Sequence, residues 1–517
     1  MSSNDPKRPG MGSVAMTVAG LLLAIAPFVI PRIPVGTDLL KHVLMAYILN
    51  HYHDPVLRYD HYFEVLWRAR STAVSELSLA ALERVLPPFD ALKAFLVLFV
   101  AVLWAASLRL TRYLGAPFTA ALVFLPLAHT FCVFSGFLPY VVSIALFPFL
   151  LAGLMDPRRT PGRIAGFAAW LLLLYAFHIV GAAVGGLALA IYAVRREEGR
   201  WRIAWRDFAA LAPIGALCVY YVLQKGSGKG VLHYFPLLTH LKSFWGYNVW
   251  TLSRLSGVLF LAAILALAAA VLVQLRRGRV LWQPALLAGL LIVIGSALPY
   301  QIDDWFVVGS RTLPFALIAA VVCLDLRRTG WHVATGAAMA LLLVSSLENT
   351  RISLAVQPKY DDFLSGVAAI PYGSNVMPII QDLALGGNQY INPFNGIEDV
   401  YTIERGGSNP YVLAMPRWVE PGDALPDPTV EVEAVGGEPN GAPILRYRDP
   451  PLYAYKFSKG GNGFQGTNYR GAGKLYDYFI VYGQVPAVMP AIEAQAKLVY
   501  TRGDLRIYES LRHAAGR

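Results

Sequence analysis

Long apolar runs, separated by short polar loops, constrain this chain more than any other feature. A helix that crosses a bilayer needs about 17–25 mainly apolar residues. The chain is 56% hydrophobic and 15% charged, which is more apolar surface than a soluble core can hide. The sequence therefore predicts an α-helical polytopic membrane protein with about eleven transmembrane helices. The predicted spans lie near 13–31, 91–110, 116–134, 137–155, 163–178, 180–194, 208–224, 256–275, 281–299, 311–326 and 331–347.

The distribution of basic residues predicts the orientation of these spans. Basic residues cluster in alternate loops, and such clusters mark the cytoplasmic side of a membrane. The N-terminus is therefore predicted to be cytoplasmic and the C-terminus non-cytoplasmic. Although the net charge is +11, the placement of the arginines between apolar runs argues against a nucleic-acid partner. The clusters are Arg109 with Arg112, 158–163, 195–206, 276–279, and Arg327 with Arg328.

The first long loop is predicted to contain helices of its own. We expect a transmembrane domain over 1–347, with a first external loop at 32–90. Within that loop, 38–51 and 71–86 have helical apolar spacing interrupted by polar residues. Such segments are expected to lie along the membrane surface.

The tail, 348–517, is predicted to be an extracytoplasmic domain of mixed α/β structure. Short β-rich runs occur at 430–434 and 476–482, and a helical pattern occurs at 488–498. Gly, Pro and Asn turns separate them. The fold class predicted for the whole chain is thus a helical membrane domain followed by a small α/β domain.

Asp38 is the carboxylate that most invites a catalytic interpretation. It follows the first span and begins a predicted helix, and His42 lies one turn later on the same face. A carboxylate there could act as a base near the outer membrane surface. It could equally be an ordinary N-cap, which satisfies free amide groups and suits the helix dipole.

Two further acids, Asp60 and Glu64, are one turn apart within an aromatic segment that could contact a sugar ring. Exposed loop acids are usually only solvated. With Asp38, His42 and His61 they could bind a hard divalent cation, Mg²⁺ or Mn²⁺, although the spacing matches no established ligand motif. No thiolate metal site is indicated, because all three cysteines lie in apolar runs.

His129 and His178 lie inside apolar spans. An ionisable residue at membrane depth needs a partner or a wet cavity, which makes each a functional hypothesis. His178, near the outer end of its span, could border an external site. A neutral histidine hydrogen-bonded to a neighbouring helix explains either residue equally well.

Basic residues near the outer ends of later spans could hold a phosphate. Arg311 opens a span beside Asp304 and Trp305, and the planar arginine fork suits a phosphate oxyanion. A snorkelling interface anchor is the other interpretation. Lys225 and Lys229, with His233 and Lys242, add positive charge in the preceding loop; they could assist, or form a solvated basic loop.

Four short segments together resemble the GT-C superfamily of polytopic membrane glycosyltransferases. They are Gly36–His42, Ser135–Tyr140, Leu174–His178 and Asp304–Arg311. The resemblance extends to the layout of many spans, an acidic residue in the first external loop and an external C-terminal α/β domain. Such enzymes use polyprenyl-phosphate sugars, so the resemblance implies that kind of donor.

The resemblance also implies roles for particular residues. A first-loop carboxylate commonly acts as the base in that superfamily, and Asp38 matches best; Arg311 would stabilise the departing lipid phosphate. His42, Asp60, Glu64, His178, Lys225, Lys229 and Asp304 would bind substrate. The first loop lacks the paired acids of several families.

A bacterial, multi-pass inner-membrane enzyme is therefore expected, with its site and tail facing the periplasm. Its acceptor would be an envelope lipid, polysaccharide or protein, and a single base predicts inversion at the anomeric carbon. Two other functions stay open: a transporter or flippase of a lipid-linked saccharide, and a non-enzymatic assembly protein that binds envelope glycans. No repeated halves of a transporter are evident.

Overall fold

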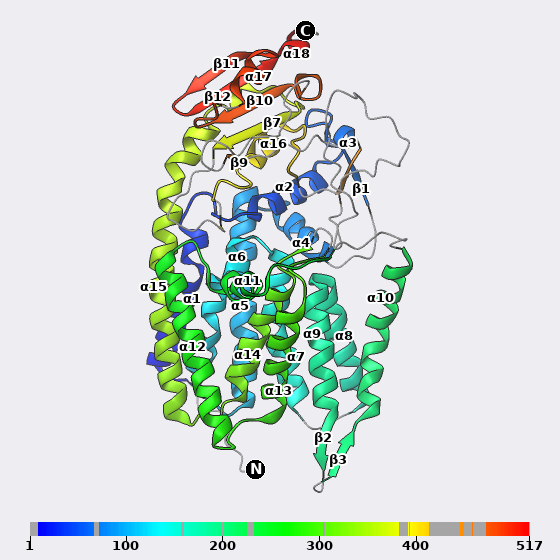
Figure 1. The fold of residues 1–517 in the computed structure, drawn as a ribbon, viewed down its shortest axis with the longest axis vertical. Coiled ribbons are helices and arrows are strands. Elements are labelled where there is room, and N and C mark those ends of the chain that lie inside the picture. The colour runs from blue at the N-terminus through cyan, green and yellow to red at the C-terminus, as the bar shows by residue number, and fades with distance from the viewer. Residues whose placement is uncertain are drawn as a thin grey trace. The chain divides into compact units, whose positions relative to one another are not determined.

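A computed structural model of the chain divides into two compact units (Figure 1). The membrane unit comprises Met1–Ile30 and Lys93–Arg351, and the loop–tail unit comprises Pro31–Leu92 and Ile352–Arg517. The first loop therefore belongs with the tail rather than with the spans that flank it. The structure describes residues 9–66, 72–156, 160–197, 200–224, 232–302, 305–381, 391, 393–412, 445–448, 457–458, 472–486 and 488–515.

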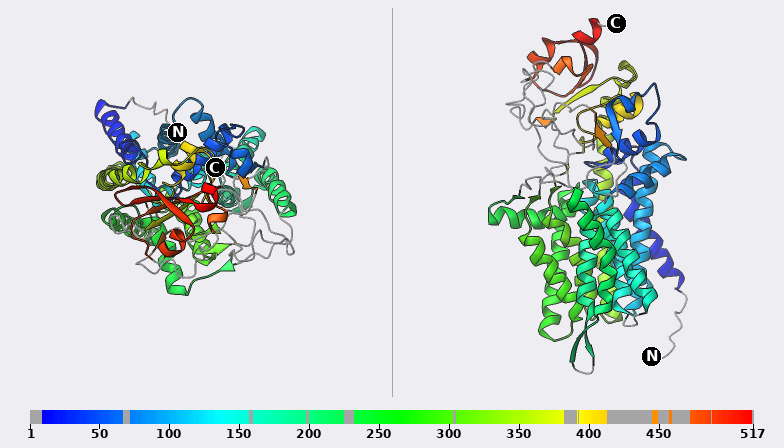
Figure 2. Two further views of the ribbon diagram at one scale, coloured as in Figure 1. Left: turned by 90° about the horizontal axis from the view of Figure 1, so that it is seen from above. Right: turned by 90° about the vertical axis from the view of Figure 1, so that its right-hand side faces the viewer.

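Long apolar helices run side by side in the membrane unit (Figures 1 and 2). Five helices of the described residues are long and apolar enough to cross a membrane. Their length and composition, with the shorter apolar helices between them, confirm a multi-pass helical membrane protein. The five are α1 (Met11–Val29), α5 (Pro88–Tyr113), α7 (Leu138–Met155), α12 (Arg254–Arg276) and α15 (Arg328–Leu364).

Several predicted spans form shorter or tighter helices. The run predicted at 116–134 becomes a 3₁₀ helix, η1 (Phe118–His129), followed by α6 (Phe131–Phe134), and Pro126 lies inside η1. Proline removes a backbone donor and disfavours a regular α-helix. The other elements of this unit are α8 (Pro161–Phe177), α9 (Ile179–Ala193), the hairpin β2 (Val194–Glu197) and β3 (Arg200–Ile203), η2 (Trp205–Leu211), α10 (Ala212–Gln224), β4 (Leu232–His233), α11 (Leu237–Val249), α13 (Trp282–Ala297), β5 (Gln301–Ile302), β6 (Trp305–Phe306), η3 (Gly309–Thr312) and α14 (Leu313–Cys323).

Glycines allow α7, α8 and α9 to approach closely. A Cβ added at Gly181 would lie 2.7 Å from Ser143 Oγ, and one at Gly185 would lie 2.8 Å from a Leu171 methyl carbon. Small residues at such positions let membrane helices pack backbone against backbone. This packing fixes the loop between α8 and α9, where His178 lies.

The loop–tail unit is built on a five-stranded mixed sheet in the order β11-β12-β10-β7-β9. Strands β7, β10 and β9 pair in parallel, and β12 pairs antiparallel with β10 and β11. The strands are β7 (Val376–Gln381), β9 (Phe457–Ser458), β10 (Tyr478–Tyr482), β11 (Ala496–Arg502) and β12 (Leu505–Ser510). The small mixed α/β domain predicted for the tail is thereby confirmed.

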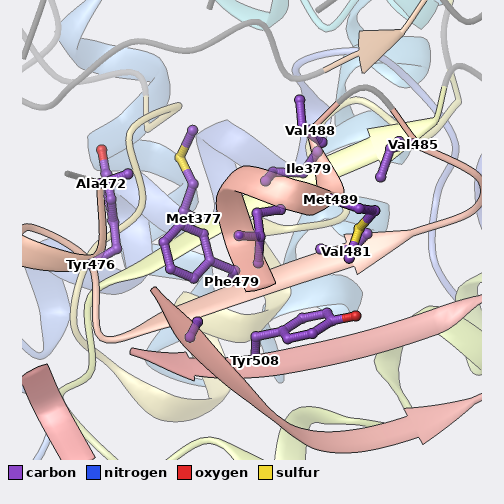
Figure 3. Close-up of a cluster of buried hydrophobic side chains, with 12 residues drawn as sticks. Met377, Ile379, Ala472, Tyr476, Phe479, Val481, Val485, Val488, Met489 and Tyr508 are labelled. Atoms are coloured by element: carbon purple, nitrogen blue, oxygen red, sulfur yellow. The ribbon is translucent and has the colours of Figure 1, made fainter. Parts of the chain in front are cut away.

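Buried side chains of β7 and β10 form one core of this sheet (Figure 3). Met377 and Ile379 face this core from β7, as Phe479 and Val481 do from β10, and the residues that alternate with them are buried on the opposite face of the sheet. Tyr508 of β12 completes the layer. Helix α17 (Met489–Glu493) covers it, and the remaining elements are η4 (Val367–Ala369), α16 (Asp399–Arg405), β8 (Leu445–Tyr447), η5 (Ala472–Lys474) and α18 (Leu511–Ala515).

The first loop supplies α2 (Leu39–Asn50), α3 (Tyr59–Tyr62), β1 (Phe63–Val65) and α4 (Ala73–Glu83). The helices predicted at 38–51 and 71–86 are therefore present in slightly shorter form. Strand β1 pairs antiparallel with β8 of the tail. This pairing gives the loop a partner that its own sequence does not reveal.

One predicted helix in the tail is wrong over half its length. The pattern at 488–498 predicts a helix, but α17 ends at Glu493 and β11 begins at Ala496. Pairing with β12, in which Ala496 lies opposite Ser510, outweighs the local apolar spacing. The β-rich run predicted at 430–434 lies outside the described residues.

Replacing Phe479 by Ala should destabilise the loop–tail unit by about 3–5 kcal/mol, because the ring is fully buried in the central strand. Thermal unfolding of purified protein in detergent measures the change. Leu498→Ala on β11, where the side chain is 45% exposed, is the matched control and should change stability little. Equal effects of the two substitutions would contradict the described core.

Candidate functional site

Asp38 lies at the N-cap position of α2, but its carboxylate does not cap the helix. No capping bond is made by the side chain. Instead Asp38 Oδ1 lies 3.0 Å from Lys41 Nζ, and the two side chains are 22% and 13% exposed. The ordinary N-cap interpretation is therefore not supported. The carboxylate is held by a lysine one turn along the helix and retains access to solvent.

A second acid, Asp399, comes to this place from the tail. It begins α16, which packs against α2, and it is fully buried. Gly396, in the turn before α16, adopts φ +95°, and a Cβ there would lie 3.1 Å from the Thr37 carbonyl oxygen and 3.9 Å from Asp399 Oδ2. Only a residue without a Cβ lets this turn pack so closely against the start of α2.

The two oxygens of Asp399 have different environments. Oδ1 accepts a hydrogen bond from Asn409 Nδ2 at 2.9 Å. Oδ2 is buried and has no hydrogen-bond partner within the described residues. Burial raises the pKa of the Asp399 carboxyl to about 7; Lys41 and Asn409 oppose this increase, and Asp38 adds to it. The Asp399 carboxyl is thus about half protonated near neutral pH.

His42 points into the helix pair instead of standing beside Asp38 as a second ligand. Its Nδ1 lies 3.2 Å from Glu76 Oε1 on α4, and both side chains are buried. This buried contact ties α2 to α4. His42 therefore supports the helix that carries Asp38.

The other first-loop acids do not join this cluster into a metal site. Asp60 is exposed, with His53 Nδ1 at 3.9 Å, whereas Glu64 lies in β1 and lines a cavity. No group of three or more His, Cys, Asp or Glu that could hold a metal forms among the described residues. The lysine beside Asp38 already balances its charge.

A second cluster lies in the membrane unit, around Arg311 of η3. Arg311 Nη1 lies 2.9 Å from His178 Nε2. The Arg311 guanidinium carbon lies 4.7 Å from the ring centre of Phe137 and 5.8 Å from that of Tyr140, which are cation–π distances. The arginine is therefore held against aromatic faces, unlike a side chain that snorkels into water.

Both ring nitrogens of His178 face hydrogen-bond donors. Nδ1 caps α9 by accepting the Val180 N–H at 3.2 Å, while Arg311 Nη1 approaches Nε2. A neutral imidazole has one acceptor and one donor. When Nδ1 accepts the Val180 N–H, the proton is on Nε2 and the Arg311 contact brings two donors together, which an anionic oxygen accepting from both would relieve.

Three of the four segments that carry the GT-C resemblance converge on this cluster. Phe137 and Tyr140 come from Ser135–Tyr140, His178 ends Leu174–His178, and Arg311 ends Asp304–Arg311. Asp304, Lys225 and Lys229 lie outside the described residues. The fourth segment, Gly36–His42, contributes Asp38 and Lys41 to the other cluster.

His129 has a structural explanation. Its Nδ1 lies 2.7 Å from Ser345 Oγ and its Nε2 lies 3.0 Å from the Ala24 carbonyl oxygen. The ring is fully buried between η1, α15 and α1. Of the two interpretations offered by the sequence, the histidine hydrogen-bonded to neighbouring helices is the one observed.

Sequence analysis missed Lys41, Glu76 and Asp399. Lys41 lies one helical turn after Asp38, and Glu76 lies on the apolar face of α4. The polar residues inside the two predicted helices were therefore a signal that could have identified both. Asp399 is separated from Asp38 by most of the chain. The tail thus places a buried acid near the start of α2.

The comparisons with known proteins agree with this architecture. No protein-family model and no curated protein matches the chain. The crystal structure of ArnT from Cupriavidus metallidurans in the apo state matches over 96% of this chain and 97% of that chain, with a TM-score of 0.50 and 12% identity. ArnT is a GT-C glycosyltransferase.

The fold is similar to that of ArnT. At 12% identity the likeness shows the fold alone. The fold expected from the resemblance inferred from the sequence is thus confirmed. The roles expected of Asp38 and Arg311 stay predictions.

Asp399 should make stability depend on pH. Its folded pKa of about 7 exceeds the ordinary 3.8, so the folded protein binds the proton more tightly than the unfolded chain. The contribution of Asp399 to the free energy of unfolding is therefore complete below about pH 4. It is lost as pH rises through about 7, by roughly 1.4 kcal/mol per pH unit between these values.

Thermal unfolding from pH 5 to pH 8 measures this effect. Asp399→Asn keeps a neutral side chain of the same shape, so the stability of the variant relative to the parent should rise over this range. Asp504→Asn, at an exposed position, serves as the control. A difference between parent and Asp399→Asn that does not change with pH would contradict the buried, proton-binding acid.

Proposed function

We propose that this protein is a membrane glycosyltransferase that moves a sugar from a polyprenyl-phosphate-linked donor to an acceptor in the cell envelope. The observation that carries the proposal is a GT-C fold in which a first-loop carboxylate, Asp38, is held by Lys41 beside a proton-binding acid. An aspartate that only capped a helix would not need these partners. Asp399, whose pKa is about 7, is a neighbouring acid that can take the proton on from the base.

The chemistry assigned to Asp38 is removal of one proton. The acceptor hydroxyl attacks the anomeric carbon, the bond from that carbon to the donor phosphate breaks, and its electron pair leaves with the phosphate. Asp38 takes the hydroxyl proton, and Asp399 is the neighbouring group that can share it. One displacement with one base gives inversion at the anomeric carbon.

Arg311 and His178 are the residues to which we assign the leaving phosphate. The arginine brings charge, and the two donors that face each other would both point at a phosphate oxygen. Aromatic contacts with Phe137 and Tyr140 keep the guanidinium in place. A fixed cation costs little reorganisation when negative charge develops.

The same proposal includes the cellular location of the protein and the kind of acceptor. The alternation of basic loops supports a bacterial inner membrane with the loop–tail unit in the periplasm. The acceptor would be a lipid, polysaccharide or protein of the envelope. Dependence on Mg²⁺ or Mn²⁺ is a separate prediction, which comparison of transfer with and without a chelator measures.

Asp38→Asn should reduce sugar transfer by at least about 100-fold while the protein stays folded, since the amide cannot accept the proton. Radiolabelled or mass-tagged donor, incubated with envelope extract and the purified variant, gives the rate. Glu493→Gln, an exposed acid at the end of α17, is the control. Near-normal transfer by Asp38→Asn would show that Asp38 is not the base.

Arg311→Ala should raise the donor KM and lower kcat, because charge on the lipid phosphate loses its partner. Arg311→Lys should recover only part of the loss, since a lysine keeps the charge but not the planar fork. Steady-state kinetics with varied donor separate the two constants. Unchanged constants in both variants would leave Arg311 as a structural residue.

A further inference from the structure

A cavity of about 610 Å³ lies within the first loop. Its walls come from the end of α2 and the turn that follows, from β1, and from one face of α4. Small-molecule sites usually have volumes of about 300–1,000 Å³. The residues of the Asp38–Asp399 pair do not line it, so the cavity is a separate feature of the same unit.

Hydrogen bonds fix the polar wall of this cavity. Asn50 Nδ2 donates to the Ala80 carbonyl oxygen at 2.8 Å, which joins α2 to α4. Arg84 Nε donates to Asn50 Oδ1 at 3.3 Å. Tyr52 donates its hydroxyl to the Phe63 carbonyl oxygen at 2.8 Å. The polar groups are thus held in place by the protein before any ligand binds.

The wall combines two kinds of surface. Asn50, His53, Glu64 and Arg84 provide planar polar groups of both charge signs, and Tyr52 provides a ring. The remaining lining is aliphatic: Leu49, Val65, Leu77, Ala80 and Ala81. A saccharide ring has the same division, with C–H groups on its faces and hydroxyls around its edge. A purely apolar or singly charged ligand would leave part of this wall unmatched.

We infer that this cavity binds a saccharide unit of the acceptor. The inference rests on the proposed function, and it narrows the acceptor from any envelope molecule to one that carries a glycan. Arg84, Asn50 and Glu64 bind the hydroxyls, and the aliphatic wall with Tyr52 receives the face of the ring. The cavity is then a recognition site, and Asp38 is the reacting group.

Saturation-transfer NMR on the full chain in nanodiscs tests the inference. The probes are methyl α-D-glucopyranoside, N-acetyl-D-glucosamine, D-glucuronate and maltotriose at millimolar concentrations. The parent should bind at least one of them. Ala81→Trp, which fills the cavity from an exposed position, and Arg84→Leu should each weaken that binding about tenfold or more.

The control variant is Arg502→Ala, which removes an exposed arginine from β11 and should leave sugar binding unchanged. Asp38→Asn should also bind sugar normally, because it alters only the reacting group. Binding that persists in both Ala81→Trp and Arg84→Leu would overturn the inference. So would the failure of the folded parent to bind any of the four probes.

Kinetics separate this inference from the proposed function. Where transfer is measured, Arg84→Leu should raise the acceptor KM about tenfold and leave kcat at saturation unchanged, whereas Asp38→Asn should lower kcat. Transfer with an unaltered acceptor KM in Arg84→Leu would contradict only the inference that the cavity binds a saccharide unit of the acceptor. Sugar binding that depends on Arg84 in a protein without transfer activity would contradict the proposed function and leave saccharide binding in the cavity intact.

Discussion

Close packing of the turn before α16 against the start of α2 determines which acidic residues the candidate site contains. A Cβ added at Gly396 would lie 3.1 Å from the Thr37 carbonyl oxygen, and the Tyr59 hydroxyl donates to the Thr402 carbonyl oxygen at 2.6 Å. These contacts join a segment near the N-terminus to one near residue 400. Because of them a buried acid lies next to Asp38. Without this packing Asp399 would not be buried near the start of α2.

Much of the architecture could be read from local patterns. Apolar runs of the right length predicted the long helices, and the helical spacing of apolar residues predicted α2 and α4. These features depend on neighbours within a few residues. The strand at Tyr478–Tyr482 was found for the same reason, since its side chains are β-branched or aromatic. The GT-C fold followed from the order of these parts together with short segments.

The parts of the site that escaped prediction depend on distant contacts. Nothing near Asp399 marks it as a partner of Asp38, and burial by the whole unit sets its acidity. The contact between Arg311 Nη1 and His178 Nε2 arises because η3 lies beside the junction of α8 and α9. Likewise β11 replaced a predicted helix because β12 offered a pairing partner. In each case a tertiary contact, absent from any local window, decided the outcome.

The pairing of β1 with β8 has a consequence for how the chain is made. Phe63 lies opposite Tyr447, and in the main sheet Val376 lies opposite Tyr478. Contacts between residues so far apart in sequence form slowly, and those with the C-terminal strands wait until synthesis is nearly complete. The first loop must therefore stay without its partner while every later span is inserted. During synthesis, therefore, the first loop must be kept from aggregating until β8 is available to pair with β1.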